Sequence, residues 1–208
     1  MIPRENPDLY LDLPDSSPPD VWDADVEVRV RRVLPGQHRI SRDPGMALVT
    51  VLGSCVAACI GDPMAGVGGL NHFMLPGEVG QSQKYAASGM RYGQFAMERL
   101  IHDLLAEGAH KDRLEGKIFG GAAMFKSSMP IGISNIKFVE GFLKEEKIKI
   151  LAHDVGGLNA RRIYYFPVTG RVICLELRRQ NDRKVFDNEI IYGRKLKVAR
   201  TAPEFGLF

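Results

Sequence analysis

The chain has 208 residues, of which 45% are hydrophobic and 25% are charged, and its formal net charge is +3. These are the values of an ordinary soluble globular protein, and they exclude a mostly disordered chain, a collagen and a coiled coil. No stretch approaches the roughly 18 apolar residues of a membrane-spanning helix, and the first residues lack the basic start and apolar run of a signal peptide. The sequence therefore predicts a cytoplasmic protein without membrane insertion.

The first part of the chain predicts an arm followed by strands. Residues 1–25 contain seven carboxylates, five prolines and one arginine, which is typical of an extended or disordered lead-in. Valines then alternate with charged residues over residues 26–31, the pattern of a half-buried strand. Apolar runs predict further strands over residues 46–52, 55–60 and 67–75, with a turn at residues 62–66 between the last two.

The second part predicts two helices and four strands. Met97, Leu100, Ile101 and Leu104 have the spacing of one helical face, and Gly108 is suited to end that helix. A short strand is expected over residues 117–119, a helix over residues 135–146 with Ser134 as its cap, and strands over residues 148–153, 162–166 and 171–177.

These elements define a fold class and a division of the chain. Strands and helices do not alternate regularly, so an α+β fold of layered, mixed β-sheets flanked by helices is favoured over a doubly wound parallel sheet. We expect an arm over residues 1–25, one domain over residues 26–178 and a basic extension over residues 179–208. That extension is more typical of a solvated face than of a nucleic-acid-binding surface, because no aromatic residues cluster with its basic ones.

Cys55 and His72 are the residues that most suggest chemistry. A cysteine hydrolase needs a thiolate and an imidazole within hydrogen-bond reach. If Pro63 and Met64 form the centre of a two-residue hairpin, Cys55 and His72 lie directly opposite each other on neighbouring strands. A buried cysteine and a core histidine without any catalytic role remain the alternative from the residues alone.

Three neighbours of this pair are polar or flexible. Gly53 and Ser54 place the thiol just after a strand end, where backbone N–H groups can turn toward one point, as in an oxyanion site. Asn71 could contact a substrate amide, but adjacent strand residues point to opposite faces, so Asn71 and His72 are not expected to line one pocket without a bulge.

The other two cysteines suggest no chemistry. Cys59 and Cys174 lie in apolar runs and are expected in the core. The three thiols form no Cys-x-x-Cys pair and are too few for a disulfide framework, so reduced thiols are expected. A zinc site made from Cys55, Cys59 and His72 has no convincing fourth ligand.

Several motifs in order resemble the family of the chemotaxis protein CheD. The resemblance covers about Val26 to Arg178, and it is carried by residues 52–57, 62–63, 68–76, 92–93, 117–122, 131–135, 154–157 and 161–162. Members of that family are chemoreceptor glutamine deamidases with a cysteine-hydrolase fold. The resemblance implies that Cys55 is the nucleophile, that His72 is the base, and that no metal or organic cofactor is used.

The resemblance also bears on a third residue and on partners. The family pattern has a catalytic threonine six positions before the cysteine; here that position is Val49, and Thr50 beside it is the candidate. The implied substrates are glutamines of methyl-accepting chemotaxis receptors. Some family members also bind a CheY-phosphate phosphatase, CheC, so an adaptor for receptors or a CheC-type phosphatase, with little catalysis, is the alternative function.

Overall fold

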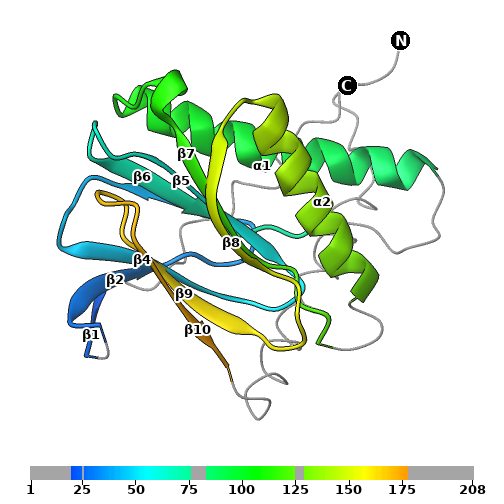
Figure 1. Cartoon of the computed structure of the whole chain (residues 1–208), viewed down its shortest axis with the longest axis horizontal. Helices are drawn as coiled ribbons and strands as arrows, with labels where there is room; N and C mark the ends of the chain where they lie inside the picture. The colour runs from blue at the N-terminus through cyan, green and yellow to red at the C-terminus, as the bar shows by residue number, and fades with distance from the viewer. Residues whose placement is uncertain (1–19, 25, 76–82, 125–128, 178–208) are drawn as a thin grey trace, which may run out of the picture.

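A computed structural model describes residues 20–24, 26–75, 83–124 and 129–177. Within these residues, ten strands form two five-stranded sheets, accompanied by two α-helices and a short 3-10 helix, η2 (Lys111–Arg113) (Figure 1). Both sheets contain parallel and antiparallel pairs. The predicted α+β class with mixed sheets is confirmed.

The first sheet, sheet A, has the strand order β1-β2-β4-β9-β10. Its strands are β1 (Val21–Asp23), β2 (Val28–Arg32), β4 (Met46–Leu52), β9 (Arg161–Tyr165) and β10 (Val172–Glu176). The pair β2–β4 is parallel, and the other neighbours are antiparallel.

The second sheet, sheet B, has the order β3-β6-β5-β7-β8. Its strands are β3 (His38–Ser41), β6 (Val67–Asn71), β5 (Val56–Asp62), β7 (Glu115–Gly120) and β8 (Lys149–Val155). Here β7–β8 is the parallel pair. The consecutive strands β4 and β5 therefore belong to different sheets, and the chain crosses between the sheets at residues 53–55.

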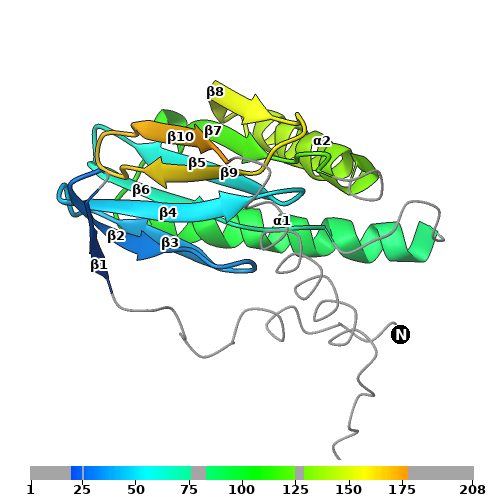
Figure 2. The same ribbon diagram turned by 90° about the horizontal axis from the view of Figure 1, so that it is seen from below.

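The molecule is layered, with sheet A on one side of sheet B and the helices on the other (Figures 1 and 2). The helices α1 (Gln83–Ala106) and α2 (Met129–Glu145) pack on strands of sheet B. The predicted apolar face of α1 is buried, and Gly108 beyond its end has a φ of +91°, a conformation that glycine adopts without strain.

Strand β4 shows how the two faces of sheet A differ. Leu48 and Leu52 belong to the main core between the sheets, whereas Ala47 and Val49 belong to a second apolar cluster with Tyr164. Because strand side chains alternate, Thr50 shares the inward face with Leu48 and Leu52. Thr50 thus points toward sheet B and Val49 points away from it.

Several element boundaries differ from the predictions. The sequence predicted neither β1 nor β3, and β1 lies inside the segment expected to be an arm. Helix α2 begins at Met129, so Ser134 lies inside the helix and the prediction that it caps α2 is wrong. Most of the expected arm and the whole basic extension lie outside the described residues.

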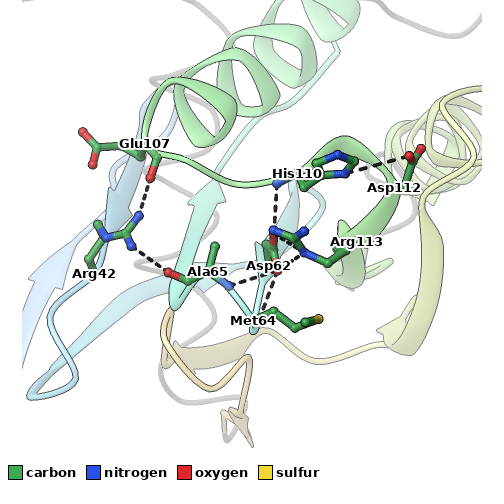
Figure 3. A network of polar contacts seen from close by, with 8 residues as sticks. All are labelled: Arg42, Asp62, Met64, Ala65, Glu107, His110, Asp112 and Arg113. Carbon is green, nitrogen blue, oxygen red and sulfur yellow. Dashed lines mark hydrogen bonds and ion pairs between the residues drawn. The ribbon is translucent and has the colours of Figure 1, made fainter.

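The turn that joins β5 to β6 is fixed by a buried carboxylate (Figure 3). Asp62 accepts backbone hydrogen bonds from Met64 (3.1 Å), Ala65 (3.2 Å) and His110 (2.9 Å), and it pairs with the Arg113 guanidinium at 2.7 Å. Burial would raise the pKa of Asp62, but the bonds from Arg113, His110 and Ala65 outweigh it and lower the pKa to about 2. We call Asp62–Gly66 the turn end of the hairpin that β5 and β6 form.

A second cation ties the same turn to helix α1. Arg42 donates to the carbonyl of Ala65 at 2.7 Å and to the carbonyl of Glu107 just beyond α1 (Figure 3). The turn end is therefore joined to the segment that connects α1 to β7.

Candidate active site

The opposite end of the hairpin begins where the chain crosses between the sheets. Residues 53–55, which we call the crossover loop, follow β4 and precede β5. Each carbonyl of this loop accepts a hydrogen bond: Gly53 O from Ala122 N (2.7 Å), Ser54 O from the Asn135 side chain (2.8 Å) and Cys55 O from Gly121 N (2.7 Å). Three consecutive peptide groups are thereby fixed in orientation.

A close backbone approach explains a glycine beside this loop. Gly120 has a φ of +106°, and a Cβ atom there would lie 2.2 Å from the carbonyl oxygen of Cys55. Only glycine avoids both the strain and the clash. The Gly120-Gly121 pair is therefore part of the support of Cys55.

The observed register does not place His72 directly opposite Cys55. The connection between β5 and β6 is a four-residue turn, Pro63–Gly66, and the register pairs Asp62 with Val67 and Val56 with Phe73. The predicted two-residue hairpin is wrong, because the Asp62 carboxylate organises a longer turn. Continuing the observed register by one residue places Met74 opposite Cys55, so His72 is the diagonal neighbour, with Cα atoms about 7–8 Å apart in a regular ladder.

The backbone of His72 is held by the connection between β2 and β3. Its carbonyl accepts from Gly36 N (2.7 Å), and its N–H donates to Gln37 O (2.9 Å). His72 is 3% exposed. Segments from both sheets therefore meet around this residue.

Thr50 contacts the imidazole directly. Its Oγ1 lies 2.8 Å from His72 Nδ1 and 2.8 Å from the carbonyl oxygen of Val33, and the residue is 5% exposed. The inward face of β4 brings the hydroxyl there, whereas Val49 lies on the other face of the strand.

The proton count of this contact fixes the tautomer of the imidazole. A carbonyl oxygen only accepts, so the single hydroxyl proton of Thr50 is donated to Val33 O. Oγ1 must then accept a proton from Nδ1–H of His72. The neutral ring consequently carries its proton on Nδ1 and its basic lone pair on Nε2, which is the nitrogen able to take a proton from a thiol.

The other two candidates, Ser54 and Asn71, lie in different surroundings. The Ser54 hydroxyl is 4.0 Å from the sulfur of Met74, two residues beyond His72. The Asn71 amide accepts from Ala58 N (2.9 Å) and donates toward the carbonyl of Ala96 on α1 (3.4 Å). Asn71 therefore points toward the helix layer, as strand alternation predicted, and the structure does not bring it to the Thr50–His72 contact.

The three thiols differ in burial. Cys55 and Cys59 are buried, and burial raises the pKa of Cys59. Cys174, expected in the core, is only partly buried because it lies on the edge strand β10, where its Sγ is 3.1 Å from an Asp154 carboxylate oxygen. Partial burial and that carboxylate raise the pKa of Cys174 to about 12. Within the described residues, no group of three or more His, Cys, Asp and Glu side chains could hold a metal ion.

Sequence reasoning missed Asn135 as part of this region. Asn135 is fully buried on α2, where its amide contacts the crossover loop. The usable signal was its place one turn before Val139 on the apolar stripe of the helix, since a polar side chain on a buried face needs specific partners.

Comparison with known proteins identifies the family. A family model described as "CheD chemotactic sensory transduction" matches residues 74–176. A "probable chemoreceptor glutamine deamidase CheD" of Rhodopseudomonas palustris (strain BisA53) is 48% identical over 177 residues, which cover 85% of this chain and 83% of that protein.

Two further relatives carry the same name. The protein of Thiobacillus denitrificans is 41% identical over 90% of this chain and 93% of its own length. The protein of Caulobacter vibrioides (strain NA1000 / CB15N) is 49% identical over 67% of this chain and 74% of its own length. The chain belongs to the CheD family.

In the part of the chain that the structure describes, no helix is long and apolar enough to span a membrane.

Proposed function

We propose that the chain is a chemoreceptor glutamine deamidase whose catalytic domain covers residues 26–178. The names of its relatives support the reaction. The single observation that carries the proposal is the Thr50–His72 contact, because it orients a buried imidazole with Nε2, its basic nitrogen, turned away from Thr50. In the continued β5–β6 register, His72 is the diagonal neighbour of Cys55.

The first half of the reaction is acyl transfer to the thiol. Nε2 of His72 takes the proton of Cys55, and the thiolate attacks the carboxamide carbon of a receptor glutamine. Backbone N–H groups of the crossover loop stabilise the oxyanion, each good donor contributing about 3 kcal/mol. The C–N bond then breaks, and His72 returns the proton to the departing ammonia.

The second half is hydrolysis of the thioester. Nε2 of His72 takes a proton from water as the oxygen attacks the carbonyl carbon, the C–S bond breaks, and the proton returns to Cys55. Glutamine has become glutamate, and one water has been consumed for each ammonia released. The reaction as written uses no metal or organic cofactor.

Thr50 has the role of an orienting group. By accepting from Nδ1–H, it keeps Nε2 free of its proton in the neutral ring and steadies the ring when it becomes positively charged. The three cysteines are free thiols, which supports a reducing compartment such as the cytoplasm as the place of the reaction.

The test is mass spectrometry of a purified soluble chemoreceptor fragment after incubation with the protein. The expected result is conversion of particular glutamines to glutamate, with release of ammonia in equal amount. Cys55→Ala is the control, because it removes the nucleophile and little volume. Conversion by Cys55→Ala at the wild-type rate would overturn the Cys55 mechanism, and binding of the fragment without any conversion would support the adaptor function instead.

A further inference from the structure

Asn135 joins the two segments that carry Cys55 and His72. Its Nδ2 donates to the carbonyl of Ser54 at 2.8 Å, and its Oδ1 accepts from the backbone N–H of Leu75 at 2.8 Å. Ser54 immediately precedes Cys55, and Leu75 lies three residues beyond His72. One amide group on α2 thus bridges both sides of the proposed site.

The orientation of this amide is determined by its partners. The Ser54 carbonyl can only accept, and the Leu75 N–H can only donate, so the reversed orientation of the amide would lose both bonds. Asn135 is fully buried, so water cannot replace either partner at low cost.

Helix α2 holds Asn135 at a fixed distance from the loop. A Cβ atom at Gly132 would lie 2.4 Å from the carbonyl oxygen of Gly121, so α2 is in close contact with the backbone of Gly121. The N–H of Gly121 in turn donates to the carbonyl of Cys55. Farther along α2, the Phe138 ring packs edge-on against Phe73, with ring centroids 5.8 Å apart. These contacts pack α2 against the support of the crossover loop and against the segment that follows His72.

The bond to Ser54 has a consequence for Cys55. In a trans peptide the C=O and N–H bonds lie in one plane and point in opposite directions. Holding the Ser54 carbonyl toward α2 therefore directs the N–H of Cys55 away from α2 and sets the plane from which the Cys55 side chain projects.

We propose that Asn135 is a positioning residue for the deamidation reaction, acting by fixing the Ser54–Cys55 peptide relative to the segment of His72. This inference rests on the proposed function. It assigns Asn135 no contact with substrate, and it predicts that the loss appears in kcat while KM changes little, because only the orientation of the reacting groups changes.

The decisive variant is Asn135→Asp, because its chemistry depends on pH. An ionised carboxylate presents an oxygen to the Ser54 carbonyl and repels it, whereas a protonated carboxyl donates to that carbonyl and still accepts from Leu75 N–H. Burial favours the protonated form and raises the pKa of such a group. The kcat of Asn135→Asp relative to wild type should therefore rise as the pH is lowered.

The experiment measures kcat and KM on a chemoreceptor fragment for wild type, Asn135→Asp, Asn135→Ala and Asp62→Asn, at a temperature where each is folded by circular dichroism. Asn135→Ala should lower kcat about 10- to 100-fold, the cost of a misplaced reacting group, with KM changed less than about threefold. Asp62→Asn is the matched control, since Asp62 is an equally buried polar anchor at the turn end. It should keep kcat within about twofold of wild type.

A second readout does not depend on the receptor. Alkylation of Cys55 by iodoacetamide is followed by peptide mapping and divided by the alkylation rate of buried Cys59 in the same molecule, which corrects for global opening. We expect this ratio to change at least about threefold in Asn135→Ala and to stay constant in Asp62→Asn.

The outcomes are separable. Wild-type protein that converts no glutamine contradicts the proposed function, and the labelling ratio then still decides the positioning role. Active wild type with unchanged kcat and an unchanged labelling ratio in both folded Asn135 variants overturns the inference. A relative kcat of Asn135→Asp that falls as the pH is lowered also overturns it.

Discussion

The β5–β6 hairpin is anchored by buried polar groups at both ends, but the two ends use different chemistry. At the turn end, Asp62 is ionised and pairs with Arg113, whose side chain is 38% exposed. At the other end, the Asn135 amide, the Thr50 hydroxyl and backbone groups hold the crossover loop and His72. A charge fixes the turn end, where its partner Arg113 can reach water, and neutral groups hold the end where the proposed reaction would transfer a proton.

This difference has a physical reason. A permanent charge beside the imidazole would shift the pKa on which acid–base chemistry depends, whereas an amide or hydroxyl orients the ring with a smaller effect. We therefore expect substitutions at the crossover end to change activity more than stability, and substitutions at the turn end to do the reverse.

The largest expected effect is on activity, for His72→Asn. Asparagine can place an N–H near Thr50 Oγ1 but cannot act as a base, so kcat should fall about 10²- to 10⁴-fold. Ammonia release from a receptor fragment measures it, with thermal unfolding as a check on folding. A His72→Asn variant that is folded and fully active would contradict the proposed role of His72 as the catalytic base.

The next effect is on stability, for Asp62→Asn. The amide nitrogen would face the donors of His110 or Arg113, so a well-paired anchor becomes a poorly paired one, and the free energy of unfolding should fall by about 2–3 kcal/mol. Urea unfolding at neutral pH measures this loss. If kcat of the folded variant also fell well beyond twofold, the turn end and the crossover end would not have separate effects on stability and activity.

The pH dependence of stability sharpens the same comparison. The pKa of Asp62 is lowered from 3.8 to about 2 in the folded protein, so its ionised form stabilises the fold above pH 3.8, and that stabilisation is lost as the pH falls toward 2. A shift of this size corresponds to about 2 kcal/mol. The difference in unfolding free energy between wild type and Asp62→Asn should therefore be constant from pH 7 to about 5 and shrink below pH 4.

Much of this architecture could be predicted from the sequence, and two of the failures, the β5–β6 turn and Asn135, have a common cause. The face of α1 and most strands followed from local patterns, because apolar periodicity depends on near neighbours. The length of the β5–β6 turn did not, because it depends on Asp62 meeting His110 and Arg113 from a distant segment. The role of Asn135 could not be predicted for the same reason, because its partners lie 60 and 81 residues away in the sequence.

The smallest expected effect, and the finest test of the crossover end, is at Thr50. Thr50→Val keeps the shape of the side chain but removes the hydroxyl that joins Val33 O to Nδ1 of His72, and the ring can then carry its proton on either nitrogen. Loss of one orienting bond lowers kcat about 2- to 13-fold, and more if the bond strengthens when the ring is charged.

Thr50→Ser keeps the hydroxyl and should retain most of the activity, with a small loss of stability from the missing methyl group. Parallel measurement of kcat and KM for both variants distinguishes orientation from packing: Thr50→Val with wild-type kcat would mean that Thr50 only fills the inward face of β4, and that backbone contacts at Gly36 and Gln37 are enough to hold His72.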